Sequence, residues 1–272
     1  MKKLVLFFTL AYAFSWLAWL PLYGPALGIN GLPVLPYHHA YGAFGPLLSA
    51  FICARIFKSP SPANLVRGMS VIRNKTMLAI AFFAPFVLAA LAIMISSLIN
   101  HIPIGLGTIG KSDELKNFGV VPFILYNILT FGYGEEVGWR GYALPVLQQR
   151  FNRLTAAAIL TIFWAVWHLP LFLYRPGYTG MDLAGIAGWF FSLLTGSILL
   201  SWLYNSAKGS IMVCAVFHAT IDVAFTSHYD DKSVINYLGM AVTVAGIIVA
   251  FQLAKKAPEH MLSVTDGSQL RY

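Results

Sequence analysis

Charged residues are scarce in this chain, since they make up 10% of its 272 residues, against roughly 25% in soluble domains. Acidic residues are the rarest, with 10 aspartates and glutamates against 18 lysines and arginines. Hydrophobic residues reach 58%, and the mean hydropathy is +0.71. This composition excludes an ordinary soluble domain and predicts an integral membrane protein.

Cysteines and common binding fingerprints are few as well. Cys53 and Cys214 both lie in apolar runs, which argues against a disulfide framework and favours small buried side chains. The glycines at 132–141 form neither a GxxxxGK[ST] nor a GxGxxG pattern, so they do not predict a phosphate loop, and no HExxH zinc helix occurs in the sequence. No linker divides the chain, and we therefore predict a single transmembrane domain over 1–255 with a polar tail over 256–272.

Eight apolar stretches run along the sequence, most of them near the ~20 residues that a helix needs to cross the membrane. They cover about 4–23, 40–54, 76–99, 118–134, 154–174, 183–204, 210–227 and 233–254. The first resembles a secretory signal but continues through "SWLAWLPLY", so we expect it to be retained. The sequence thus predicts an all-α polytopic membrane protein, a bundle of about eight transmembrane helices.

The basic residues are distributed unequally between the predicted loops. With eight crossings, one side of the membrane receives Lys111, Lys116, Arg175 and Lys232, and the other receives all remaining lysines and arginines, Arg140 included. The positive-inside rule then places both termini in the cytoplasm. We expect membrane lipids as partners, in a bacterial plasma membrane. No basic and aromatic surface indicates nucleic-acid binding, and the oligomeric state is left open.

Six ionisable side chains remain inside or beside the apolar runs: Glu135, Glu136, Arg140, His168, His218 and Asp222. Such groups are costly at membrane depth and normally face protein or water in a functional site. Their number predicts one intramembrane polar site. Taken singly, each is also typical of a solvated interfacial group or of a structural polar contact between helices.

Helical spacing assigns partners within this set. Glu136 and Arg140 are four residues apart and are expected to pair, whereas Glu135 lies about 100° round the helix and stays free. Trp164 and His168 share a helical face, and Pro170 loosens the helix just beyond. His218 and Asp222 are again four apart, so that the carboxylate can orient the imidazole.

If the polar residues form one site, they must lie at a similar depth in the membrane. His168 lies about 20 Å along its helix, so Glu135 must also lie well within the membrane. We therefore expect the fourth span to be long, or broken at Gly132 and Gly134. Glycines in this region also permit close approach between helices.

The motifs "EEVGWR", "WAVWH" and "HATID" resemble, in order, EExxxR, FxxxH and HxxxN/D. On these residues the chain resembles the CPBP family of intramembrane proteases, also called the Abi or CAAX-protease family, with its Rce1-like members. The motifs occupy about 118–227. Trp164 replaces the family's Phe, and Asp222 replaces the Asn of Rce1-like members.

The resemblance implies an intramembrane endopeptidase of the glutamic type (EC 3.4) that acts on a membrane-associated protein or peptide. It assigns water activation to Glu135 and His168, and oxyanion stabilisation to His218 with Asp222. Glu136, Arg140 and Trp164 are then expected to support the site without reacting. No cofactor is implied.

Three alternatives stay open from the residues themselves. Glu135, His168 and His218 are a possible zinc ligand set, in which case the enzyme is a metalloprotease. Intramembrane Glu, His and Asp are also typical of a proton-coupled transporter. Finally, the same fold without activity is expected to serve as an immunity or scaffold protein.

Overall fold

The computed structural model describes residues 1–105, 109–112 and 115–255, and every regular element in these ranges is a helix. The tail predicted over 256–272 lies outside the described residues. Six helical stretches in this part are long and apolar enough to cross a membrane. They are α1 (Lys2–Tyr23) with the 3-10 turn η1 (Gly24–Leu27), α2 (His39–Phe57), α4 (Lys75–Asn100), α8 (Arg153–Trp167) with α9 (Leu171–Tyr174), α10 (Leu183–Ser206) and α12 (Ser233–Lys255). The all-α, polytopic prediction is confirmed.

The two other predicted spans take different forms. The stretch at 210–227 is the shorter apolar helix α11 (Ile211–Thr226). The stretch at 118–134 is part of a longer helical segment made of five consecutive pieces. These are α5 (Val120–Asn127), the π-helix η3 (Ile128–Gly132), α6 (Tyr133–Gly138), the π-helix η4 (Trp139–Ala143) and α7 (Leu144–Gln148).

This composite segment is about 40 Å long at 1.5 Å per residue, and Glu135 lies near its middle. The long helical segment expected around Glu135 is therefore present, and its depth in the membrane stays a prediction. π-Helical turns are rare and occur often at functional sites, because each extra residue shifts the register of the side chains that follow. Here η3 and η4 flank the turn that carries Glu135 and Glu136.

Polar residues define where several helices begin. Asn74, Asn152, Asp182 and Ser210 each use a side-chain oxygen to accept a backbone N–H of the first helical turn, which stabilises α4, α8, α10 and α11. Ser61 does the same for α3 (Pro62–Ser70), a short helix between α2 and α4. α8 ends at Trp167, and the turn at 168–170 places His168 just beyond it.

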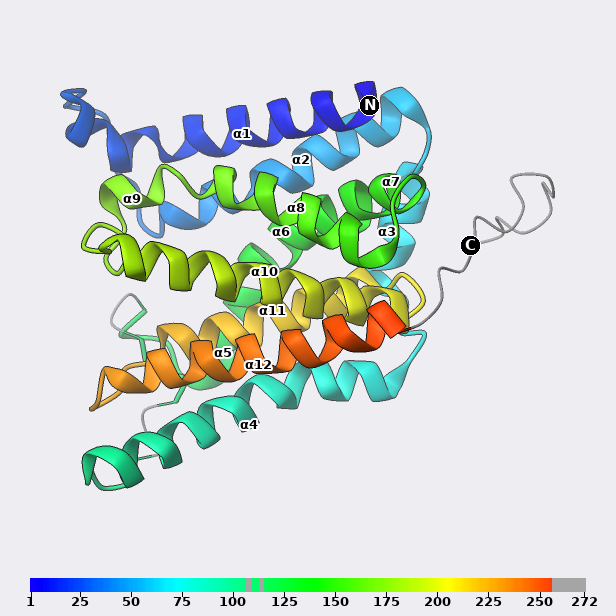
Figure 1. Ribbon diagram of the computed structural model, residues 1–272. Coiled ribbons are helices and arrows are strands. Elements are labelled where there is room, and N and C mark those ends of the chain that lie inside the picture. Colours follow the sequence, from blue (N-terminus) through cyan, green and yellow to red (C-terminus); the bar gives the residue numbers. More distant parts are fainter. Residues whose placement is uncertain (106–108, 113–114, 256–272) are drawn as a thin grey trace.

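Glycines bring α6 against the backbones of two neighbouring helices. A Cβ added to Gly134 meets the carbonyl oxygen of Ala43 in α2 at 2.6 Å, and one added to Gly132 meets that of Ala215 in α11 at 2.5 Å. A Cβ on Gly138 meets Pro46 of α2 at 2.4 Å. The expected close approach of helices is confirmed. α6, which carries both glutamates, lies in the middle of the bundle (Figure 1).

The helices run roughly side by side across the bundle (Figure 1). α1 packs along α2 at one edge, and α4 lies at the opposite edge against α11 and α12. The start of α1 and the end of α12 lie at the same end of the bundle, as an even number of crossings requires.

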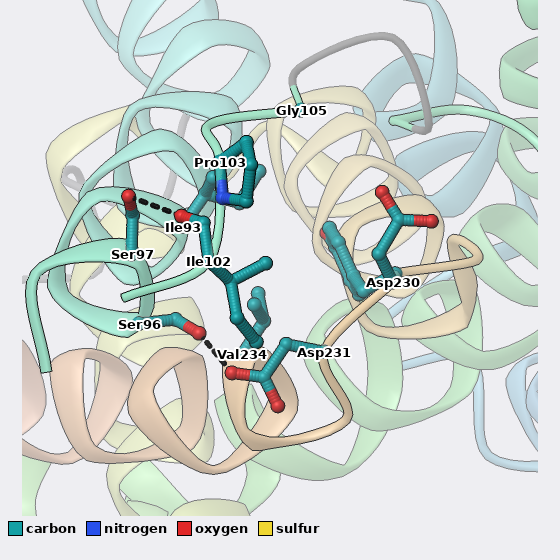
Figure 2. Close-up of a pocket in the computed structure, with 10 residues that line it drawn as sticks. Ile93, Ser96, Ser97, Ile102, Pro103, Gly105, Asp230, Asp231 and Val234 are labelled. Carbon is teal, nitrogen blue, oxygen red and sulfur yellow. Dashed lines mark hydrogen bonds between the residues drawn. The ribbon is translucent and has the colours of Figure 1, made fainter. Parts of the chain in front are cut away.

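A polar cluster joins the end of α4 to the start of α12 beside a small pocket (Figure 2). Asp231 accepts hydrogen bonds from Ser96, from Asn100 Nδ2 at 2.7 Å and from Ser233 Oγ at 2.5 Å. These donors, Ser233 foremost, hold the pKa of Asp231 well below its usual range. The cluster fixes α4 to α12 far from the three motifs.

Candidate active site

Glu136 is the centre of an ion-pair cluster that joins two helices. Its Oε1 accepts a hydrogen bond from Arg140 Nη1 at 2.8 Å and lies 2.7 Å from His218 Nδ1 on α11. Glu136 and Arg140 are fully buried. The predicted Glu136–Arg140 pair is therefore present, and it additionally holds a histidine 82 residues further along the chain.

Arg140 is held on three sides. Besides Glu136, its Nη2 donates to Ser197 Oγ on α10 at 3.1 Å, and its guanidinium carbon lies 4.6 Å from the ring centroid of Trp164. This last geometry is that of a cation–π contact. The topology prediction had counted Arg140 among the cytoplasmic basic residues, whereas the structure buries it within the bundle.

Glu135 is not bound to Arg140, in agreement with the sequence prediction. Its Oε2 accepts from the indole nitrogens of Trp164 at 2.9 Å and of Trp139 at 3.3 Å. Among the described residues, no hydrogen bond reaches its Oε1. The carboxylate is thus fixed through one oxygen and has the other available as an acceptor.

His168 is fixed through one ring nitrogen. Its Nδ1 lies 2.7 Å from the carbonyl oxygen of Trp164, one turn earlier. A carbonyl cannot donate, so Nδ1 carries the proton and Nε2 of the neutral ring is an acceptor. No partner for Nε2 occurs in the described part of the chain, and the side chain is 8% exposed.

Asp222 makes a looser contact with His218 than the sequence suggested. Its Oδ2 lies 3.5 Å from His218 Nε2, which is long for a hydrogen bond, and its side chain is 32% exposed. The short contact of the imidazole is the one to Glu136. Glu136, rather than Asp222, therefore orients the His218 ring.

Trp164 connects the three motifs. Its indole nitrogen binds Glu135, and its ring centroid lies 5.6 Å from that of His168 and 5.6 Å from that of His218. The candidate residues from α6, α8 and α11 thus surround one indole ring. The single polar site expected from the sequence is present as a geometric cluster.

Aromatic rings from α9, from the loop after it and from α10 cover His168. Tyr178 lies nearly parallel to the imidazole at 6.5 Å between centroids, and Trp189 meets it edge-on at 5.8 Å. Phe172 packs at 5.2 Å against both of these rings. Burial raises the pKa of Tyr178 to about 12, so its hydroxyl stays protonated at neutral pH.

Sequence reasoning missed several members of this site. Trp139 lies four residues after Glu135, and that spacing was a usable signal for a same-face contact. Ser197 carried no signal, because nothing in the sequence connects it with Arg140. Tyr178 and Trp189 likewise carried no signal, since loop and helix geometry bring them to His168.

The sequence left open that Glu135, His168 and His218 together bind a zinc ion. Within the described ranges, no three His, Cys, Asp or Glu side chains are grouped so as to hold a metal ion. In this geometry Glu135 Oε2 and His168 Nδ1 are already occupied by protein groups. Glu135 Oε1 and His168 Nε2 remain, and a metal-binding imidazole commonly donates its other N–H to a carbonyl, so the zinc alternative stays a prediction.

Comparisons with known proteins point to one family. The sequence model described as type II CAAX prenyl endopeptidase, Rce1-like, matches residues 117–224, the segment that carries all three motifs. The chain is 27% identical over 194 residues to CAAX prenyl protease 2 of Methanococcus maripaludis. The matched region covers 65% of this chain and 68% of that protein.

It is also 25% identical over 133 residues to lysostaphin resistance protein A of Staphylococcus haemolyticus. That match covers 47% of this chain and about a third of the relative, 34% of its length. The family match over 117–224 and the first of these relatives thus support the resemblance to the CPBP, Rce1-like family that the three motifs indicate.

Proposed function

We propose that this protein hydrolyses a peptide bond of a membrane-associated protein or peptide with a water molecule activated by Glu135 and His168. The observation that carries the proposal is the pair of available acceptors, Glu135 Oε1 and His168 Nε2, beside one indole ring. A water that donates one hydrogen to each acceptor directs an oxygen lone pair away from both, towards a substrate carbonyl.

The reaction then follows from the proton positions. The water oxygen attacks the carbonyl carbon of the substrate while Glu135 takes a proton from the water. The product of this step is a tetrahedral intermediate with a negatively charged oxygen. Collapse of the intermediate breaks the C–N bond, and the leaving amine receives the proton from Glu135. His168 orients the water throughout, because its Nδ1 is fixed by the carbonyl of Trp164.

His218 is assigned to the oxyanion. Glu136 holds its Nδ1, so its Nε2 is the nitrogen directed away from the ion pair. In the imidazolium form, Nε2 donates a hydrogen bond to the developing negative charge. The carboxylates of Glu136 and Asp222 flank the ring on either side and balance that charge. The glutamic mechanism, a bacterial plasma membrane and cytoplasmic termini are all part of this proposal.

The test uses the full chain reconstituted in liposomes, with a fluorogenic CAAX peptide supplied in prenylated and unprenylated forms. Glu135→Gln keeps the size of the side chain and an acceptor for both indoles, and is expected to lower kcat by about 10²–10⁴-fold. Asp230→Asn makes the same chemical change at an exposed loop carboxylate and is the matched control. Equal turnover by wild type and Glu135→Gln removes Glu135 from the mechanism, whereas no turnover of either peptide by the wild type favours a scaffold role.

The same assay separates the zinc mechanism from the glutamic one. We expect a zinc chelator to leave the rate unchanged, because in the proposed mechanism Glu135 and His168 activate the water without a metal ion. Loss of activity with chelator and its recovery on adding Zn²⁺ would instead establish the metalloprotease. Cleavage of either peptide also decides between a peptidase and a transporter, since a transporter leaves the peptide intact.

A further inference from the structure

A groove of about 540 Å³ lies between α4 and α11, outside the candidate active site. Its wall on α4 is a continuous apolar stripe formed by Leu78, Ala79, Phe82 and Phe83. These positions repeat at the spacing of one helical face. The charged residue in the lining is Lys75, the first residue of α4.

Two hydrogen bonds join the walls of the groove beyond its lining residues. Thr220 Oγ1, one turn after Val216 in α11, donates to the carbonyl oxygen of Ala81 in α4 at 2.9 Å. At the other end, Arg73 Nη1 donates to the carbonyl oxygen of Lys208 at 2.6 Å, just before α11 begins. The separation of the two helices between these points is therefore fixed, and the groove is a built feature of the bundle.

The groove opens to the outside of the protein. α4 lies at the edge of the bundle (Figure 1), and Phe83 is 61% exposed. Ile72, at the end of the lining near Lys75, is 45% exposed. In a chain that spans a membrane, an apolar surface of this kind faces hydrocarbon, so the chemistry that fits its walls is that of an acyl chain.

Lys75 gives the groove a charged end. Its side chain is exposed, and the described part of the chain offers it no hydrogen bond or ion pair. α4 begins at the end of the bundle where α1 also begins (Figure 1), the side that the basic residues assign to the cytoplasm. A lysine at that interface attracts the phosphate of an anionic lipid.

We propose that this groove binds one acyl chain of an anionic phospholipid, with the lipid phosphate against Lys75. The apolar walls match the chain, and the lysine ammonium matches the phosphate charge. The site is separate from peptide hydrolysis. On α11 the groove residue Val216 lies two positions before His218, about 200° round the helix, so the two face opposite directions.

The test measures lipid retention by the full-length protein with native mass spectrometry. Phosphatidylglycerol and phosphatidylcholine with identical acyl chains are offered in equal amounts. Lys75→Gln is expected to weaken retention of phosphatidylglycerol about fivefold, the effect of one basic residue at a membrane surface, and to leave phosphatidylcholine unchanged. Ala79→Trp fills the groove and is expected to abolish retention of both lipids.

Lys58→Gln is the matched control, since Lys58 is exposed at the same end of the bundle and does not line the groove. Equal retention of the two lipids by the wild type would overturn the proposal, as would an equal effect of Lys58→Gln and Lys75→Gln. Displacement of the bound lipid by an uncharged prenyl compound as readily as by phosphatidylglycerol would also overturn it and assign the groove to a prenyl chain. The readout is binding, so it stands whether or not the proposed peptidase activity is found.

Discussion

Glu136 Oε1 lies 2.7 Å from His218 Nδ1 and 2.8 Å from Arg140 Nη1, so one buried oxygen is shared between a histidine and an arginine on different elements. Glu136 Oε2 and Arg140 Nε, both fully buried, have no hydrogen-bond partner in the described part of the chain. The pair is therefore joined by a single contact rather than by two parallel ones. Its geometry serves the orientation of His218 as well as charge balance.

This relationship predicts different effects on stability and on catalysis. Arg140→Met leaves Glu136 buried without its arginine and is expected to cost about 3–5 kcal/mol of stability. The double variant Glu136→Gln/Arg140→Met removes both charges, so we expect most of that stability to return while kcat stays about a hundredfold or more below wild type. Thermal unfolding and peptide cleavage measure the two effects. A double variant with wild-type kcat would show that Glu136 is purely structural.

Asp222 is expected to tolerate loss of its charge. It lies 3.5 Å from His218 and is partly exposed, and an asparagine amide at this position can donate to an oxyanion, which a carboxylate cannot. Asp222→Asn should keep kcat within about tenfold of wild type, or 1.4 kcal/mol. Asp222→Leu, which removes all hydrogen bonding, is the comparison and should lose more. A kcat for Asp222→Asn as low as that of Glu135→Gln contradicts this assignment.

Trp164→Phe tests the indole that connects the motifs. The substitution keeps an aromatic ring for packing but removes the donor 2.9 Å from Glu135 Oε2. Loss of a hydrogen bond to a charged group costs about 1.5–3 kcal/mol, and we expect kcat to fall roughly tenfold or more with little change in KM. Trp139→Phe removes the longer contact, at 3.3 Å, and should cost less. The reverse order would show that Trp139 is the indole that positions Glu135.

Gly134→Ala tests whether the close approach of α6 and α2 sets the site. The added Cβ comes within 2.6 Å of the carbonyl oxygen of Ala43, so α6 must shift. We expect a loss of about 1–3 kcal/mol in stability together with lower kcat, because Glu135 is the next residue. Gly188→Ala on α10 has open space around its Cβ and is the control. Unchanged unfolding and turnover in Gly134→Ala would mean that the two helices can separate without disturbing the carboxylate.

The lowered pKa of Asp231, which lies outside the membrane-spanning helices, predicts that the stability of the fold depends on pH. Its pKa is lowered in the folded protein by the donors at Ser233, Ser96 and Asn100, so its carboxylate stabilises the fold above the ordinary aspartate pKa of 3.8. This stability is lost as pH falls below about 4 and the group becomes protonated. The thermal midpoint of wild type should exceed that of Asp231→Asn at pH 7, and the difference should shrink towards pH 3. A constant difference over that range would show that the carboxylate charge is not involved.

Periodicity and composition were sufficient for most of the architecture. Long apolar runs without charge gave the approximate limits of six spans out of the eight predicted, because hydrocarbon excludes ionised groups. The i,i+4 spacing of Glu136 and Arg140 also fixes their pairing, since it depends only on helix geometry. Glu135 follows as the glutamate without an arginine.

The tertiary structure decided which side chains on different helices contact each other. The two π-helices around α6, the turn that ends α8 before His168, and the angles at which α6, α8 and α11 meet determine which groups touch. For this reason the partner of His218 is Glu136, 82 residues away, rather than Asp222 on its own helix. Local spacing gives the face of a helix on which a side chain lies, but only packing fixes what lies opposite that face.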